Sequence, residues 1–291
     1  MNKIAWVTVN RLCNLHCSWC YVGFDRKVGP PSMDRSLLHD LIDLCADGGI
    51  TKIVFIGGEP SVYPYLTEGI KHCSQRSLNT EITTNGIRLA NGPFVNKLVD
   101  AGLGSVMISL KGSDRKVFEQ TTGKDAFNAV VSALKTVSSS GLKLNVSAVL
   151  TTSFVNHLET LTEILADCAV NKIVFSFLKE FGEKDALFLA ENSPEVILPL
   201  LHDKLLFPAS DFTHLDWCIE TCLPLFEQEK MFDGFFKGRF HHSCQGARNA
   251  PISFDTAGRL LYCNALPRLS HALYGTDFTD YEQLSQYLRY E

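Results

Sequence analysis

The sequence predicts an α/β fold built on a parallel sheet, and two observations lead to that prediction. Short runs rich in Ile, Val, Leu and Phe recur along the chain, as expected for strands covered on both faces. Segments with helical spacing of apolar residues separate them. Six such units in succession imply right-handed crossovers onto one sheet. The expected strands are Ile4–Val9, Lys52–Ile56, Asn79–Thr83, Gly104–Ser109, Leu142–Leu150 and Lys172–Phe177.

The first helix is expected to begin after Ser32, whose side chain can cap it, and to end at Gly48–Gly49. Its apolar residues recur at helical spacing. The same spacing predicts helices over Phe94–Leu98, Phe127–Val137 and Leu158–Leu165.

A closed eightfold barrel would need two more units, and none is recognisable after Phe177. Helical character is expected from about Asp185 to Glu229. Pro251–Asn264 predicts two short strands around the turn Asp255–Gly258. We therefore predict a boundary near residue 183, dividing the chain into 1–183 and 184–291.

Composition excludes several classes of protein. The 291 residues are 45% hydrophobic with a formal net charge of -5, which is inconsistent with dominant disorder. The sequence contains no apolar run long enough to span a membrane and no signal peptide, so a cytoplasmic location is expected. Without a Lys/Arg tract, nucleic acid held by charge is not expected. Ten cysteines in such a chain are more typical of metal ligands or redox groups than of disulfides.

Three of these cysteines, Cys13, Cys17 and Cys20, lie on the loop after the first strand. In parallel α/β folds this is the edge of the sheet that carries reactive residues. Thiolates are the ligands that iron–sulfur clusters take, and three ligands on a four-iron cube leave one iron open. The spacing alone also allows a zinc knuckle completed by His16, or buried cysteines without a ligand.

The C-x₃-C-x₂-C spacing, with Trp19 before the last cysteine, resembles the radical S-adenosylmethionine (radical SAM) superfamily. The resemblance implies a partial (β/α)6 TIM-like barrel. It also implies a 4Fe–4S cluster on Cys13, Cys17 and Cys20 that binds SAM at its open iron. Electron transfer then cleaves SAM to methionine and a 5′-deoxyadenosyl radical, which takes a hydrogen atom from the substrate. A reducing partner such as flavodoxin or ferredoxin would supply the electron.

Further motifs in the expected order strengthen the resemblance. Gly57-Gly58-Glu59-Pro60 resembles the family's GGEP motif, in which paired glycines allow close approach to a ligand and a carboxylate suits the SAM ammonium. Relatives often have an acid where this chain has Lys111, so we expect a cation facing SAM or an anionic substrate group. The other positions that the resemblance assigns to SAM are Thr84, Asn85, Ser109 and, at the adenosine end, Asn145.

A second cysteine set lies downstream. Thirteen residues separate Cys244 from Gly258 and four separate Gly258 from Cys263, which resembles the opening of a SPASM or twitch extension. No dense cysteine run follows, which favours the shorter twitch form, a small α+β domain with one auxiliary 4Fe–4S cluster. Cys218 and Cys222, four apart in a predicted helix, would face one side and complete its ligands. Alternatively, one of them is a free thiol that returns a hydrogen atom to the substrate, or the set is zinc-binding or structural.

The predicted function is therefore a radical SAM reaction in natural-product or ribosomal-peptide maturation: epimerisation, crosslinking or dehydrogenation. The first strand begins near the start of the sequence, so no leader-binding segment is expected before it. This expectation weakens the hypothesis of a peptide substrate. The main alternative substrate is a small polyhydroxylated metabolite such as an aminoglycoside. A zinc-stabilised binding protein without catalysis is the alternative from another class.

Overall fold

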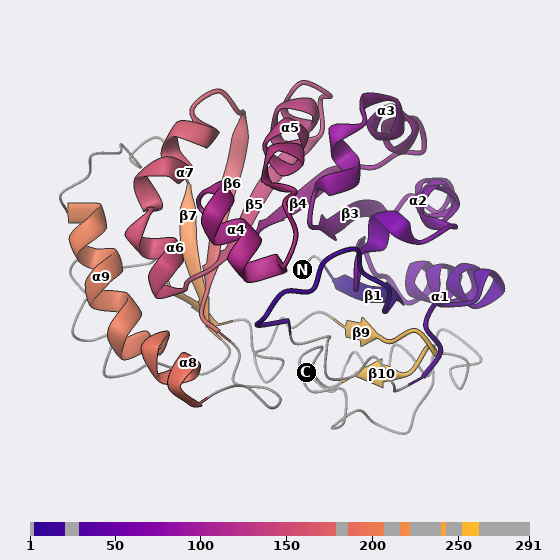
Figure 1. Ribbon diagram of the computed structural model, residues 1–291. Helices are drawn as coiled ribbons and strands as arrows, with labels where there is room; N and C mark the ends of the chain where they lie inside the picture. Colours follow the sequence, from indigo (N-terminus) through magenta and orange to yellow (C-terminus); the bar gives the residue numbers. More distant parts are fainter. Residues whose placement is uncertain are drawn as a thin grey trace.

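The structure is a computed structural model of the 291-residue chain (Figure 1). It describes residues 3–20, 29–178, 186–206, 216–221, 240–242 and 252–261.

Ten strands form one sheet in the order β10-β9-β1-β2-β3-β4-β5-β6-β7-β8. Neighbouring strands from β1 to β8 are all parallel, which confirms the predicted α/β fold. Each of the six predicted strands forms within about two residues of its expected bounds. The six are β1 Ile4–Asn10, β2 Lys52–Gly57, β3 Asn79–Thr84, β4 Ser105–Leu110, β5 Lys143–Val149 and β6 Val170–Ser176.

The sheet continues beyond the six predicted strands. β7 (Trp217–Thr221) pairs parallel with β6, and β8 (Phe240–His242) pairs parallel with β7. The prediction of helix from Asp185 to Glu229 was therefore wrong for β7. A spacing of four residues fits both periods, because side chains four apart share a face on a strand as well as on a helix. Trp217 and Ile219 are buried, and this burial on the sheet decides the conformation.

The helices follow the strands in chain order, and Figure 1 shows α1, α2, α3, α5 and α7 arranged around the outside of the sheet. Their bounds are α1 Arg35–Asp47, α2 Leu66–Gln75, α3 Gly92–Asp100, α4 Arg115–Thr122, α5 Phe127–Ser138, α6 Thr152–Asn156, α7 Leu158–Leu165, α8 Ala186–Glu191 and α9 Pro194–Leu206. Two short 3₁₀ helices, η2 Pro60–Val62 and η3 Ile87–Ala90, follow β2 and β3.

The first helix is capped by Asp34 and not by Ser32, which corrects the prediction. Asp34 Oδ1 accepts hydrogen bonds from the Ser36 backbone N–H at 2.8 Å and from its hydroxyl at 2.7 Å. Ser32 instead forms an isolated antiparallel bridge with Asn10 at the end of β1. The chain is thus still extended at residue 32, and the helix can begin only after it turns.

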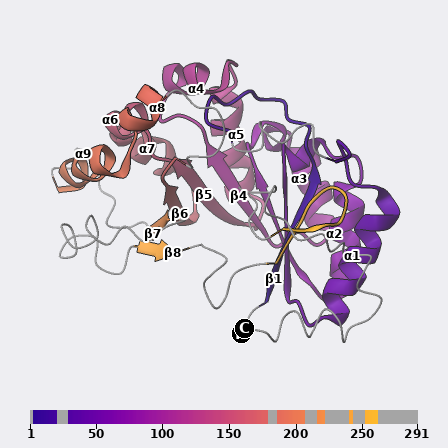
Figure 2. The same ribbon diagram turned by 90° about the horizontal axis from the view of Figure 1, so that it is seen from below.

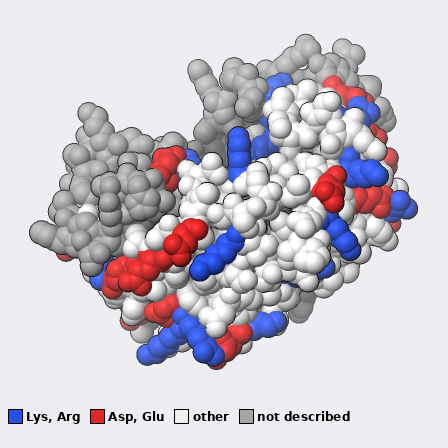
Figure 3. Space-filling view, turned by 90° about the horizontal axis from the view of Figure 1, so that it is seen from above, with Lys and Arg blue, Asp and Glu red and all other residues white. Residues whose placement is uncertain are grey.

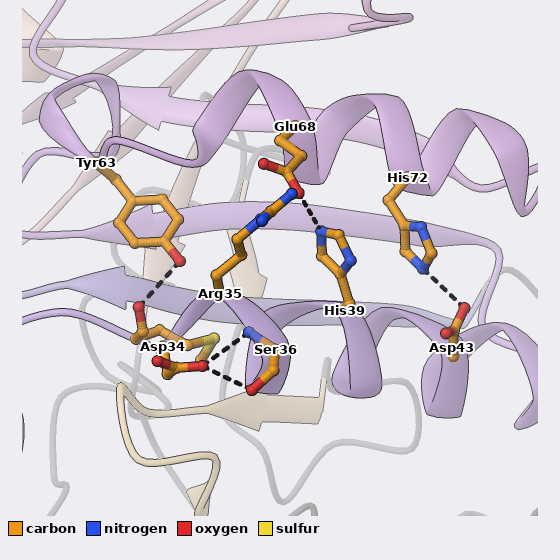
Figure 4. A network of polar contacts seen from close by, with 9 residues as sticks. Asp34, Arg35, Ser36, His39, Asp43, Tyr63, Glu68 and His72 are labelled. Carbon is orange, nitrogen blue, oxygen red and sulfur yellow. Dashed lines mark hydrogen bonds and ion pairs between the residues drawn. The ribbon is translucent and has the colours of Figure 1, made fainter.

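Polar contacts join α1 to α2 (Figure 4). Glu68 of α2 accepts from Arg35 Nε at 2.6 Å and lies 3.0 Å from His39 Nε2. His72 of α2 lies 2.9 Å from Asp43 of α1.

Charges of both signs are interspersed on the face seen in Figure 3, in keeping with the small net charge. In the described part of the chain, no helix is long and apolar enough to cross a membrane.

The predicted C-terminal hairpin forms. β9 (Ile252–Phe254) and β10 (Leu260–Leu261) pair antiparallel around Asp255–Gly258. β9 also pairs parallel with β1, so the hairpin lies at one edge of the sheet and β8 at the other (Figure 2). The barrel is therefore open, as the fold prediction requires. The predicted division at residue 183 stays a prediction.

Replacing Phe254 with Ala tests whether the hairpin belongs to the main core. Phe254 is fully buried, and its loss leaves a cavity against β1, so the free energy of unfolding should fall by about 3 to 5 kcal/mol. Urea unfolding of the full chain, followed by circular dichroism, measures this change. The control is Leu187→Ala, at a side chain that is 64% exposed, which should change stability by about 0.5 kcal/mol or less. Equal effects of the two substitutions would contradict the packing.

Candidate active site

The first cysteine set and the predicted SAM contacts other than Asn145 lie at the carboxyl ends of β1 to β4. The segment after β1 carries Cys13, Cys17 and Cys20 and runs towards α4 (Figure 1). Its backbone is held there, because the His16 and Ser18 N–H groups donate to Thr122 and Thr121 carbonyls at 3.2 and 2.9 Å. On the other side, Asn85 Nδ2 donates to Asn14 Oδ1 at 2.7 Å, which ties this cysteine loop to the end of β3.

Glu59 connects the loops after β2 and β3. Its side chain is only 1% exposed, so its charge requires internal donors. One carboxylate oxygen accepts from the Thr84 hydroxyl at 2.5 Å and from the Ser61 N–H at 3.0 Å. The other accepts from the Asn85 N–H at 2.7 Å. Thr84 and Asn85, predicted as SAM contacts, are therefore also the donors that hold Glu59.

Gly57 and Gly58 are needed for a different close approach from the one expected. A Cβ on Gly58 would lie 2.3 Å from the Leu12 carbonyl oxygen, and one on Gly57 would lie 2.4 Å from that of Asn10. The Gly58 and Glu59 N–H groups donate to these same carbonyls at 2.8 Å each. The glycines thus let β2 lie against the backbone that leads into the cysteine loop. Pro60, which is buried, follows as the first residue of η2.

The three cysteine thiols lie close enough together for a charge on Cys20 to affect the pKa of Cys13 and of Cys17. Burial is the main cause that raises the pKa of Cys13 and of Cys17, and Cys20 raises both further. Lys111 acts in the opposite direction on both thiols. A buried thiol loses its proton unfavourably when no positive charge is near. Bound iron supplies that charge, so the same thiol becomes a thiolate readily when it binds the metal.

The donor set fits a 4Fe–4S cluster. Its three thiols lie on one short loop, and within the described ranges no three His, Cys, Asp or Glu side chains converge on one point where a single metal ion would bind. A four-iron cube differs in this respect because it offers a separate iron to each thiolate, so the ligands need not meet at one point. Cys13, Cys17 and Cys20 would hold such a cluster.

Lys111 lies beside the cysteine loop, and the expectation that it faces SAM or an anionic substrate group stays a prediction. Its ammonium nitrogen lies 4.7 Å from the centre of the Trp19 ring and donates to Ser109 Oγ at 2.7 Å. The cation–π contact and the hydrogen bond orient the side chain between β4 and the loop. These two contacts fix the position of the Lys111 charge, which lowers the pKa of Cys13 and of Cys17.

A row of residues crosses the inner face of the sheet, which is the face turned away from the helices. Ser109 of β4 is in register with Ser147 of β5. Ser147 is in register with Val174 of β6, and Val174 is in register with Cys218 of β7. Cys218 is thus a strand residue, not a helical one, and it is buried. It lies at the level of Ser109, three strands or about 14 Å along the sheet.

Burial raises the pKa of the Cys218 thiol, and Lys172 acts against this shift.

Asn145, predicted at the adenosine end, is half-buried on the inner face, in register with Met107 of β4. Sequence reasoning missed Asn14 and Ser147, whereas Lys172 begins the strand that it expected, with Asn145, at the adenosine end. The alternation of polar and apolar residues along β5 was a signal for Ser147, because it shows which side chains face away from the helices. Cys222, Cys244 and Cys263 lie outside the described residues.

The fold and site define a class of protein. Residues 7–167, more than half of the chain, match the Radical SAM superfamily, and the chain belongs to this family. It is a radical SAM enzyme, and members of the family bind SAM and a 4Fe–4S cluster.

Curated relatives carry a more specific name. The chain is 31% identical over 163 residues to a probable GTP 3′,8-cyclase of Methanopyrus kandleri, covering 55% of this chain and 52% of that protein. It is 35% identical over 130 residues to the GTP 3′,8-cyclase of Chlorobaculum tepidum, covering 44% and 38%. The chain therefore spans only about half the length of these relatives or less.

Solved structures share the fold across nearly the whole chain. Streptococcus suis SuiB bound to the precursor peptide SuiA has a TM-score of 0.74 at 17% identity, covering 98% of this chain and 64% of that one. Native anSMEcpe with bound AdoMet and a Kp18Cys peptide has a TM-score of 0.73 at 14% identity, covering 99% and 83%. At these identities the likeness establishes the fold alone.

Replacing Gly58 with Ala tests the contact between β2 and the cysteine loop. The added Cβ would overlap the Leu12 carbonyl and must displace the loop, so we expect SAM cleavage to 5′-deoxyadenosine to slow by about a hundredfold. Anaerobic reconstitution followed by chromatographic assay of 5′-deoxyadenosine measures it. Gly92→Ala is the matched control, since a Cβ there meets no atom within 4 Å. Cleavage at the wild-type rate in Gly58→Ala would refute the contact.

Replacing Lys111 with Met tests its electrostatic effect. The cation favours the more negative, reduced state of a cluster on the cysteine loop, so its loss should shift the midpoint potential to more negative values. A redox titration followed by electron paramagnetic resonance (EPR) measures the shift. Lys111→Arg should retain most of the wild-type potential, and Lys97→Met, an exposed lysine of α3, should leave it unchanged. An unchanged potential in Lys111→Met would show that the charge does not act there.

Proposed function

We propose that this radical SAM enzyme matures a peptide by redox-neutral epimerisation, with Cys218 as the thiol that returns a hydrogen atom. The observation that carries the proposal is the position of Cys218. This thiol is buried on the inner face of the sheet, in the same row as Ser109. A thiol that faces the substrate region from β7, across the sheet from the cysteine loop, suits delivery of hydrogen to the face opposite to abstraction.

The chemistry balances with one external reductant. A 4Fe–4S cluster held by Cys13, Cys17 and Cys20 would supply the electron for cleavage of SAM, and through it the radical chemistry that removes a hydrogen atom from the substrate carbon. The Cys218 S–H bond then breaks and a C–H bond forms on the other face. The thiyl radical that remains takes one electron and one proton, the electron coming from a flavodoxin- or ferredoxin-class donor or from an auxiliary cluster. Burial raises the pKa of Cys218, so the group stays a thiol with a hydrogen atom to give.

Two features support a peptide as the substrate. The inner face of the sheet carries neutral polar side chains, among them Asn145, Ser147 and Ser176, which can pair with backbone amides. The shared fold with SuiB, solved with its precursor peptide, supports the same class of substrate. A small polyhydroxylated metabolite would suit the same chemistry.

The second cysteine set enters the proposal as an auxiliary 4Fe–4S site. With Cys218 as the hydrogen donor, the proposed ligands are Cys222, Cys244 and Cys263. The C-x₁₃-G-x₄-C pattern supports this assignment, and its glycine, Gly258, lies in the turn of the hairpin between β9 and β10 with φ of +76°.

The second candidate function is GTP 3′,8-cyclisation. It is favoured by the identity of 31 to 35% to proteins of that name along the barrel. GTP is therefore a required arm of the test.

The test is a reaction in deuterated water with the reconstituted full chain, SAM and dithionite. The substrates are GTP and the peptides encoded by short open reading frames beside the gene. We expect a peptide to gain one solvent deuterium at an inverted α-carbon, detected by mass spectrometry and chiral amino-acid analysis. Cys218→Ala should abolish this incorporation but still form 5′-deoxyadenosine, because only the hydrogen return is lost.

Iron content provides the control for this experiment. Two clusters predict roughly eight irons per chain in both the wild type and Cys218→Ala. A fall to roughly four irons in Cys218→Ala would identify Cys218 as a cluster ligand instead of a donor. Conversion of GTP to a cyclised product would support the second candidate, and a colourless zinc protein that leaves SAM intact would contradict both.

A further inference from the structure

The two ends of the cysteine loop meet at one point. The chain leaves β1 at Arg11, passes through the cysteines, and returns at residues 29–33. The Arg11 N–H donates to the Pro31 carbonyl at 2.8 Å, and the Met33 N–H donates to that of Val9 at 2.8 Å. These bonds form the base of the loop.

A single hydroxyl from the C-terminal hairpin bridges the two ends. Thr256 Oγ1 accepts from Arg11 Nε at 3.2 Å and donates to the Pro30 carbonyl at 2.8 Å. Thr256 is fully buried and Arg11 is 6% exposed, so water cannot easily replace either bond. Arg11 and Thr256 are 245 residues apart in sequence.

The turn that presents Thr256 is itself rigid. Asp255 is 1% exposed, and its Oδ1 accepts from the Ala257 and Arg259 N–H groups at 2.9 Å each. Its Oδ2 accepts from Arg259 Nε at 2.7 Å and lies 3.8 Å from Arg11 Nη2. The hairpin therefore brings both a bridging hydroxyl and a countercharge to Arg11, at a place defined by the turn and by the pairing of β9 with β1.

We propose that Thr256 and Arg11 are positioning residues for SAM cleavage. By joining the two ends of the cysteine loop, they fix the direction in which the chain leaves β1. Cys13 follows Arg11 by two residues, so its position depends on that direction. The hairpin lies outside residues 7–167, the part that matches the family. The segment that carries the cluster ligands is thus held in place by a segment that the family match does not include. This inference does not depend on the peptide substrate or on Cys218.

The test compares Thr256→Val, which keeps the shape but loses both hydrogen bonds, with Thr256→Ser, which keeps the hydroxyl. The full chain is reconstituted anaerobically and reduced, and SAM is titrated while the cluster's EPR spectrum is followed. We expect SAM to bind Thr256→Val about tenfold more weakly, with an altered spectrum in the SAM complex. Thr256→Ser should stay within about twofold of the wild type. Thr136→Val, which removes a hydroxyl that bonds only within α5, is the matched control and should not differ.

Arg11→Lys keeps the charge but cannot donate to Thr256 and face Asp255 in the geometry of a guanidinium. It should weaken SAM binding as Thr256→Val does, with an unchanged far-ultraviolet circular dichroism spectrum, and it carries the test if Thr256→Val does not fold. Wild-type SAM affinity and EPR spectra in a folded Thr256→Val or Arg11→Lys would overturn the proposal. Failure of both variants to fold would also overturn it, because the contact would then serve the whole fold and not the loop.

Discussion

The buried carboxylate of Glu59 is the interaction on which the candidate active site depends. A charge at 1% exposure is unfavourable unless it is fully hydrogen-bonded, and its donors come from the loops after β2 and β3. The backbone N–H of the same residue donates to Leu12 in the cysteine loop. Satisfying one carboxylate therefore brings three loops together, and the glycines before it remove the side chains that would keep those loops apart.

The C-terminal hairpin decides how the sheet ends beside β1. Because β1 pairs with β9 and not with β8, the first strand is covered on both edges and the described strands do not close into a barrel. The hairpin that provides β9 also provides Thr256 and Asp255. The same few residues thus cover an edge of the sheet and hold the cysteine loop at its base.

The thiols of the cysteine loop and Cys218 have similar electrostatic surroundings and differ in their place in the fold. Burial raises the pKa of Cys13 and of Cys17, and Lys111 acts against that shift, which would help them become thiolates on binding iron. Cys218 is also raised in pKa by burial, with Lys172 acting against it, and it lies three strands from Ser109 and Lys111. Its separation from the cysteine loop is what makes a separate chemical role reasonable.

The sequence by itself determined the six strands, most helix positions, the cysteine triplet and the hairpin turn at Asp255, because each depends on residues close together in the chain. It also marked Gly57 to Glu59, Thr84 and Lys111 as candidates, which the structure places at the carboxyl ends of β2, β3 and β4. Only the tertiary structure decided that residues 217–221 form a strand, because a four-residue spacing fits both helix and strand. It alone showed that Gly58 faces Leu12 and that Thr256 bonds Arg11. Such contacts join residues 46 to 245 positions apart, and local sequence patterns carry no information about pairings of that range.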